Sequence, residues 1–181
     1  VDFEIPDRIK DGYGINESII EQAHADGVEV ILTCDNGISA FHQVELAKKY
    51  GMTVVITDHH EVPLDGENEK IPPADAVIDP KQADCPYPFP EICGAVVAYK
   101  LVQVLYARRG VPRMEWLDLL EFAAIATVGD VMKLQDENRI LVKYGLKKMA
   151  QTKNLGLRRL AEKNNLDLGA ITAYHIGFVI G

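Results

Sequence analysis

The sequence predicts an α/β fold, a parallel sheet flanked by helices and followed by a helical segment. Apolar runs alternate with amphipathic stretches through residues 17–80. A strand, a helix and a second strand of these lengths form a βαβ unit, in which the strands are parallel and the crossover is right-handed. Beyond residue 92 the apolar residues recur at three- and four-residue steps, which is the helical period. We therefore divide the chain into a βαβ portion over 1–90 and a helical portion over 91–181.

The βαβ portion contains five predicted elements: a helix over 17–27, a strand over 28–37, a helix over 39–51, a strand over 52–60 and a short strand over 74–80. The first helix has Asn16 as a candidate N-cap and Gly27 as its stop. The run "VEVILTCDNG" is almost continuously apolar, which predicts a strand buried on both faces. The acidic stretch over 63–70 predicts a solvated loop.

The helical portion contains four predicted helices, over 93–110, 114–130, 137–150 and 155–164. Before them, the stretch "KQADCPYPFPEI" over 81–92 carries alternating prolines, which rule out a regular element. We therefore expect a surface loop between the two portions.

Composition places the chain among ordinary folded proteins. Its 181 residues, 48% hydrophobic and 25% charged, are enough for one globular domain with a sizeable core. It has no apolar run of the roughly 18 residues that a membrane span needs, and its first residues lack the layout of a secretory signal. We expect a cytoplasmic protein with no membrane partner. An odd number of cysteines without Cys-x-x-Cys spacing, Cys34, Cys85 and Cys93, indicates reduced and mostly buried thiols.

The net charge of -8 argues against a nucleic-acid partner, because such partners bind to clusters of Lys and Arg. Taken alone, the charge favours a small-molecule enzyme. However, acidic residues that hold divalent cations lower the formal charge without repelling an anionic substrate. The charge therefore makes a nucleic-acid substrate less expected without excluding it.

Polar side chains stand where two predicted strands end. One strand runs into Asp35, and the next runs into Asp58, His59 and His60. Ligands of open parallel sheets bind just outside the carboxyl ends of the strands, so these side chains should be neighbours in space. Two adjacent imidazoles at a strand end give little packing benefit, which favours a functional role for the pair.

Three carboxylates in the chain also have a structural interpretation. Asp35 stands before an Asn-Gly pair and could cap a turn by bonding to its own backbone. Asp79 ends the third strand before a proline, and turn chemistry explains it better than function does. Asp130 follows an apolar helix, so it could either point inward or close a helix-terminal turn.

Asp35, His59, His60 and Asp130 together suit a divalent metal ion. Carboxylate oxygen combined with imidazole nitrogen favours Mn²⁺, Mg²⁺ or Zn²⁺ over metals that prefer thiolates. Four side chains leave several coordination positions of a two-metal site unfilled. A complete site would need further carboxylates.

Three short motifs, in this order, resemble those of the DHH phosphoesterase superfamily: "CDNG" over 34–37, "TDHH" over 57–60 and "TVGD" over 127–130. Three longer segments look like the RecJ branch of that superfamily, the single-strand-specific 5′→3′ exonucleases: 6–16, 92–101 and 138–149. The match finishes in the segment 175–181. The likeness extends over essentially the whole chain. It implies a single, incomplete DHH catalytic domain over 1–181, with the metal motifs in the βαβ portion.

The resemblance also implies two Mn²⁺ or Mg²⁺ ions and a role for each motif residue. Asp35 resembles the carboxylate that bridges both ions, and His59 and Asp130 resemble direct ligands. His60 is similar to the histidine that contacts the scissile phosphate. Asp58 is similar to a residue that orients these neighbours.

The chain departs from the family pattern at one point. Family members carry an earlier Asp-x-Asp-Gly motif whose aspartates help to hold both ions, and these 181 residues contain none. The family also continues beyond the position of Gly181 into a second domain that grips nucleic acid. We therefore expect an internal fragment that keeps about half of the metal ligands and is inactive by itself.

The function implied for the intact protein is metal-dependent phosphodiester hydrolysis, as a 5′→3′ exonuclease on single-stranded DNA in recombination and repair. Single-strand-binding protein or a helicase would be a further partner. Relatives that cut oligonucleotides, cyclic dinucleotides or pyrophosphate are alternatives, as is a degenerate module that binds nucleic acid without cutting. An Asp-x-Asp-Gly motif encoded upstream would favour the enzyme over the binding module. A dehydrogenase is not expected, since no Gly-x-Gly-x-x-Gly follows a strand.

Contacts to a single strand would come from aromatic and basic side chains. The aromatic candidates are Tyr13, Tyr87, Phe89 and Tyr99, and a core position is the better interpretation of Tyr99. The basic stretch over 147–163 could follow a phosphate backbone, although a solvated helical face explains it more simply.

Overall fold

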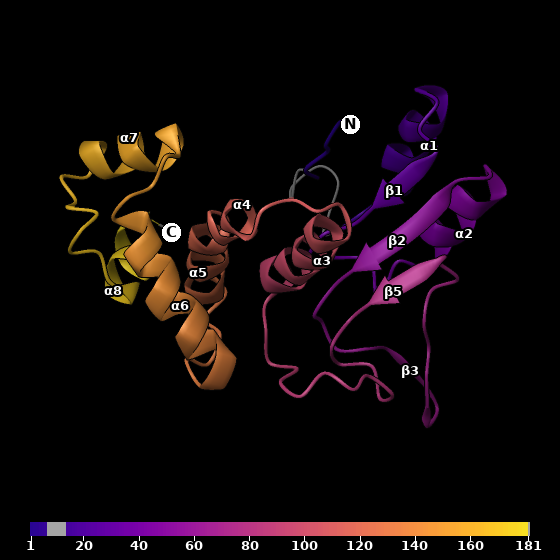
Figure 1. Ribbon diagram of the computed structural model, residues 1–181. Helices are drawn as coiled ribbons and strands as arrows, with labels where there is room; N and C mark the ends of the chain where they lie inside the picture. Colours follow the sequence, from indigo (N-terminus) through magenta and orange to yellow (C-terminus); the bar gives the residue numbers. More distant parts are fainter. Residues whose placement is uncertain (7–13, 181) are drawn as a thin grey trace. The chain divides into compact units, whose positions relative to one another are not determined.

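The structure, a computed structural model, describes residues 1–6 and 14–180. The chain forms two compact units, Val1–Pro90 and Glu91–Gly181 (Figure 1). The aromatic candidate Tyr13 and most of the segment 6–16 lie outside the described residues.

The first unit is built on a three-stranded parallel sheet, which confirms the predicted fold class. Its order is β1 (Val30–Leu32), β2 (Thr53–Thr57), β5 (Ala76–Ile78), with β2 in the centre (Figure 1). Leu32 of β1 pairs with Val55 of β2, and Thr57 of β2 pairs with Ile78 of β5. All three strands therefore end at the same edge, where the motif residues follow them.

Two helices cover one face of this sheet. They are α1 (Glu17–Ala25) and α2 (Phe41–Lys49). The predicted N-cap is confirmed, because the Asn16 side chain accepts a hydrogen bond of 2.9 Å from the Ile19 amide. Ile20 of α1 and Val44 of α2 pack in one cluster with Ile56 of β2, and all three are buried. This core fixes the position of β2 and of the residues that follow it.

The prediction that the first strand is buried on both faces was wrong. Val30 and Leu32 are 58% and 56% exposed, whereas Val54 and Ile56 of β2 are buried. An apolar run looks the same in a central and in an edge strand, because its covering comes from other parts of the chain. The cysteine prediction was right that the thiols are reduced, since Cys34, Cys85 and Cys93 are all free, but wrong that most of them are buried. Only Cys93 is buried, and Cys34, which follows the exposed strand β1, is exposed.

A small hairpin occupies the stretch that was predicted to be a solvated loop. Its strands are β3 (Leu64–Asp65) and β4 (Asn68–Glu69), which pair in antiparallel register. Gly66 lies between them with φ of 66°, a left-handed conformation that glycine adopts at low cost. The acidic composition of this stretch predicted a loop, although Gly66 was available to form the turn of a hairpin.

Every regular element in the described residues of the second unit is a helix: α3 (Gly94–Arg108), α4 (Arg113–Leu117), α5 (Leu120–Gly129), α6 (Asp136–Met149), α7 (Leu155–Lys163), α8 (Ala173–His175) and a π-helical turn η1 (Ile176–Ile180). The helix predicted over 114–130 is in fact two helices, α4 and α5. Helices α5 and α6 pack closely, since a Cβ atom added at Gly145 would lie 2.3 Å from Ala124 Cβ. None of the helices in the described ranges has both the length and the apolar character needed to cross a bilayer.

Candidate metal centre

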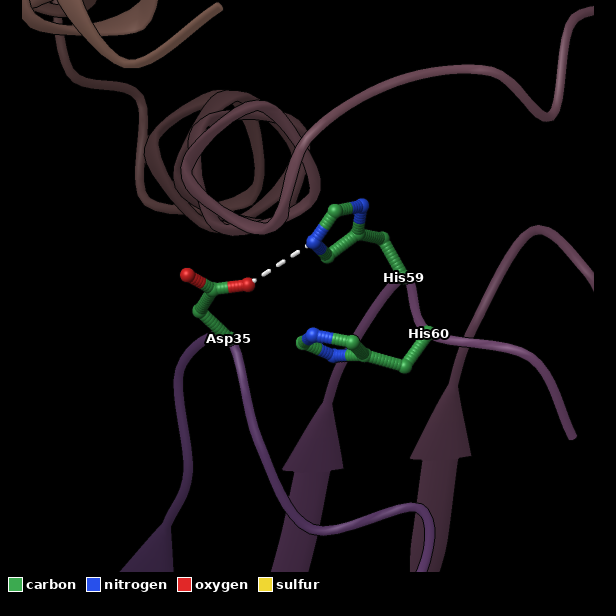
Figure 2. Close-up of side chains that lie close together, drawn as sticks. All are labelled: Asp35, His59 and His60. Carbon is green, nitrogen blue, oxygen red and sulfur yellow. Dashed lines mark ion pairs between the residues drawn. The ribbon is translucent and has the colours of Figure 1, made fainter. Parts of the chain in front are cut away.

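Three side chains converge beyond the carboxyl ends of β1 and β2. Asp35, His59 and His60 each offer a ligand atom, and these atoms lie within 4.8 Å of one another (Figure 2). His59 Nε2 lies 3.0 Å from Asp35 Oδ1. The structure therefore brings together residues that were predicted to meet from two different strands.

The backbone holds Asp35 in an unusual conformation. Its φ is 63°, in the left-handed region that a non-glycine residue adopts at a cost of about 1–2 kcal/mol. Its amide donates a 2.9 Å hydrogen bond to the Thr57 carbonyl, which fixes the turn against β2. Gly37 completes the turn with φ of 117°, and a Cβ atom there would lie 3.0 Å from Thr33 Oγ1. The Asp35 side chain is 51% exposed, so its carboxylate can reach a ligand from solvent.

Asp58 is a buried carboxylate that organises the two histidines. Its Oδ2 accepts a 2.9 Å hydrogen bond from the Ile38 amide, and its Oδ1 accepts one of 2.8 Å from the His59 amide. The same Oδ1 lies 2.6 Å from His60 Nδ1. Because an ionised carboxylate can only accept, Nδ1 of His60 is the donor, and Nε2 is left to face a ligand.

Asp79 lies at the end of β5 and is 1% exposed. Its Oδ1 accepts a 2.9 Å hydrogen bond from the Lys81 amide, which is the turn chemistry that the sequence suggested. Its Oδ2 is buried and has no hydrogen-bond partner among the described residues. Burial, and to a lesser extent the charge of Asp58, raise the pKa of Asp79, while the Lys81 amide and the charge of His59 oppose this. Turn chemistry thus accounts for only one oxygen of this carboxyl group.

The remaining candidates do not belong to the cluster that Asp35, His59 and His60 form. Asp130 is exposed at the C-terminal end of α5 in the second unit, so its approach to Asp35 stays a prediction. Tyr87 and Phe89 are partly buried in the loop, and Tyr99 is 6% exposed, as its core interpretation requires.

The first unit also contains interactions that the sequence did not indicate. The bond from the Ile38 amide to Asp58 was not expected, since no side-chain pattern marks a backbone donor. The sequence also did not indicate that the second carboxylate oxygen of Asp79 is buried without a hydrogen-bond partner among the described residues. The proline that follows Asp79 suggested turn chemistry alone. An aspartate at the end of each of three neighbouring strands was the available signal.

The family model described as the DHH family, N-terminal domain, matches residues 1–127 of the sequence. The chain belongs to the DHH family. This membership confirms the resemblance that its motifs suggested.

The DHH chain is similar to proteins named single-stranded-DNA-specific exonuclease RecJ. It is 40% identical to that of Bacillus subtilis over 178 residues, which are 98% of this chain and 21% of the relative. It is 38% identical to that of Dickeya dadantii over an alignment of 191 positions, gaps included, which covers 100% of this chain and 32% of the relative. The chain therefore spans between about a fifth and a third of the length of these curated relatives.

A solved structure with the same fold is that of exonuclease RecJ bound to manganese. The TM-score is 0.81 at 31% sequence identity, and the match covers 98% of this chain and 42% of that one. A parallel sheet flanked by helices is therefore the fold of this DHH chain.

The donor set of the cluster fits a divalent ion of the Mn²⁺ or Mg²⁺ type. Asp35 supplies carboxylate oxygen, His59 and His60 supply imidazole nitrogen, and no thiolate belongs to the cluster that the described residues form. Asp58 holds the ring of His60 through the nitrogen that faces away from the ligand, an arrangement typical of histidines at metal centres. The residues present can thus offer a cation one carboxylate and two imidazole groups.

Proposed function

We propose that this chain is the metal-binding part of a longer phosphodiesterase, a 5′→3′ exonuclease that acts on single-stranded DNA. The observation that carries the proposal is the convergence of Asp35, His59 and His60 within 4.8 Å at the carboxyl edge of the sheet. The names of the similar proteins support the substrate, and the manganese in the similar structure supports Mn²⁺ or Mg²⁺ as the cofactor.

Each residue has a distinct task in this proposal. Asp35 and His59 are ligands from the first unit, and Asp130 is a ligand from the second unit. When bound, two divalent ions lower the pKa of an attacking water and neutralise charge on the phosphodiester. His60 faces the scissile phosphate with Nε2, and a proton on that nitrogen would donate to a phosphate oxygen. Asp58 keeps the His60 ring in this orientation through Nδ1.

We further propose that the chain cannot complete this site by itself. Two ions need more ligands than Asp35, His59 and Asp130 supply, and no Asp-x-Asp-Gly motif occurs in the 181 residues. Calorimetric titration of the chain with Mn²⁺ tests this. We expect one weak site, and submicromolar binding at two sites would contradict the proposal.

The activity is tested on the complete reading frame that encodes the chain. The protein is incubated with Mn²⁺ and a labelled DNA, supplied as a single strand or as a duplex, with the label at either end. We expect release of nucleotides from the 5′ end of the single strand only, and loss of this release in Asp35→Ala while binding of DNA persists. Undiminished hydrolysis by Asp35→Ala would refute the role of Asp35 as a metal ligand.

One observation favours a second candidate, a module that binds nucleic acid without cutting it. The chain contains no Asp-x-Asp-Gly motif. A complete reading frame that also lacks this motif, combined with DNA binding but no hydrolysis, would decide for the module.

As an exonuclease, the protein would act in recombination and repair in the cytoplasm, where single-strand-binding protein or a helicase could supply the strand.

A further inference from the structure

The second unit contains a groove that the metal centre does not involve. Its volume is about 530 Å³, within the range of roughly 300–1,000 Å³ that is usual for ligand sites. Side chains from α3, α4, α5 and α6 line it, and these helices are neighbours in Figure 1. The groove therefore belongs to one unit and does not depend on how the chain's parts are arranged.

Two aromatic rings in the groove each have a cationic side chain close to the ring. The Arg113 guanidinium lies 5.4 Å from the centroid of the Trp116 ring, and Lys147 Nζ lies 5.5 Å from that of Tyr144. Tyr99 supports Trp116 from the protein interior, edge-on at 6.0 Å between ring centroids. Tyr144 is 51% exposed, so its ring is accessible to a ligand.

The charge of the lining is opposite to that of the whole chain. Four cations, Lys100, Arg113, Lys147 and Lys148, face one carboxylate, Glu137, which gives a local charge of +3 in a chain of -8. Lys100 pairs with Glu137, and Lys148 pairs with Asp118 beside the groove. In the described part of the chain, no salt bridge includes Arg113 or Lys147. These two side chains are available to an anionic ligand.

We infer that this groove binds a short stretch of single-stranded nucleic acid. Sites for single strands combine aromatic rings, on which bases stack, with cations that hold the phosphates. The groove supplies this combination twice, as Trp116 with Arg113 and as Tyr144 with Lys147. An acidic peptide would need the cations but not a repeated pairing of ring and cation. The inference extends the proposed function, since it names a contact that would hold the substrate strand.

The only tryptophan of the chain, Trp116, reports directly on this groove. The 181-residue chain is titrated with short oligothymidylates in low salt with EDTA present, and tryptophan fluorescence is followed. We expect quenching that saturates and that weakens as salt is added. Tyr144→Ala should reduce the affinity about 5- to 150-fold, because one stacked base is lost.

A matched pair of charge variants separates the groove from general electrostatics. Lys147→Gln should weaken binding and lower the salt dependence by about one released ion. Arg158→Gln removes the same charge from an exposed position on α7, outside the lining, and should leave binding unchanged. Circular dichroism confirms that each variant is folded. Equal effects of the two variants would overturn the inference.

Two further outcomes bear on the inference. Absence of quenching by oligothymidylate, or stronger quenching by a glutamate-rich peptide of equal charge, would overturn it. The Asp35→Ala variant should retain the quenching, because the groove does not need the metal centre. If the groove binds DNA but the complete protein does not hydrolyse it, the proposed function fails and the groove inference stands. If the complete protein hydrolyses DNA but the groove does not bind it, the groove inference fails and the proposed function stands.

Discussion

The carboxylates at the two ends of the three-stranded parallel sheet have different surroundings. At the amino end, Asp75 precedes β5 and its carboxylate lies 2.7 Å from both Lys48 Nζ and the Val54 amide. At the carboxyl end, Asp79 follows the same strand, is buried, and has one oxygen without a hydrogen-bond partner among the described residues. The hydrogen bond from Lys48 lowers the pKa of Asp75, whereas burial raises that of Asp79.

In the proposed function, this difference separates a structural end of the sheet from the end that binds the metal ions. A carboxylate whose charge is matched by a lysine and an amide serves the fold. The carboxyl end instead gathers Asp35, Asp58 and Asp79 around two histidines, with no lysine or arginine salt bridge to any of the three in the described residues. Such an excess of acceptors is stable only where a cation or a proton completes it.

The largest effect should come from removing a carboxylate at the carboxyl end. We expect Asp35→Ala to weaken Mn²⁺ binding at least about 100-fold, because even residues that only support ligands cost 10- to 100-fold. Calorimetric titration of the chain measures this. Asp75→Ala is the matched control at the amino end and should bind Mn²⁺ as the unaltered chain does. Equal losses in both variants would show that the two ends do not differ.

Asp58→Asn should have the next largest effect. The amide oxygen can still accept a hydrogen bond, but the side chain no longer carries the charge that holds His60 Nδ1–H. We expect Mn²⁺ affinity to fall about 10- to 100-fold with little change in the melting temperature. Unaltered affinity would mean that Asp58 only supports the loop.

Asp79→Asn should change how stability depends on pH. Since burial raises the folded-state pKa of Asp79 above its ordinary value of 3.8, the unfolded chain ionises first as pH rises. Stability is therefore lost between pH 3.8 and the raised pKa, and it stays lower above that. In EDTA, the melting temperature of Asp79→Asn minus that of the unaltered chain should increase across this window and then level off. A difference that does not vary with pH would contradict the effect of burial.

Asp75→Asn should have the smallest effect, with the opposite sign. The folded-state pKa of Asp75 is lowered, so its contribution to stability is present above pH 3.8 and is lost as pH falls through the folded pKa. The Asp75→Asn variant should therefore not show this part of the loss of stability at low pH. Added salt should shrink the effect, because the pair with Lys48 is exposed to solvent. Identical acid titrations of melting temperature would show that the pair contributes nothing.

Much of the fold and the cluster could be predicted because they follow from local patterns. Apolar runs of strand length, alternating with helical periods, require a parallel sheet, and the strand ends then bring Asp35 to His59. The same reasoning could not show that Val30 is exposed, because the covering of a strand comes from distant residues. It also could not divide the helix over 114–130, which contains no proline and has no glycine near the break. There Asp118 pairs with Lys148 and Lys153, which are distant in sequence.

The central claim is that Asp35 and His59 hold a divalent ion at the carboxyl edge of the sheet, with His60 beside it. Manganese anomalous diffraction from crystals of the chain grown with Mn²⁺ tests it most directly. We predict an anomalous peak in bonding contact with the Asp35 carboxylate and with His59 Nε2. Crystals in which these two groups remain 3.0 Å apart as a direct pair, with manganese elsewhere, would contradict the claim.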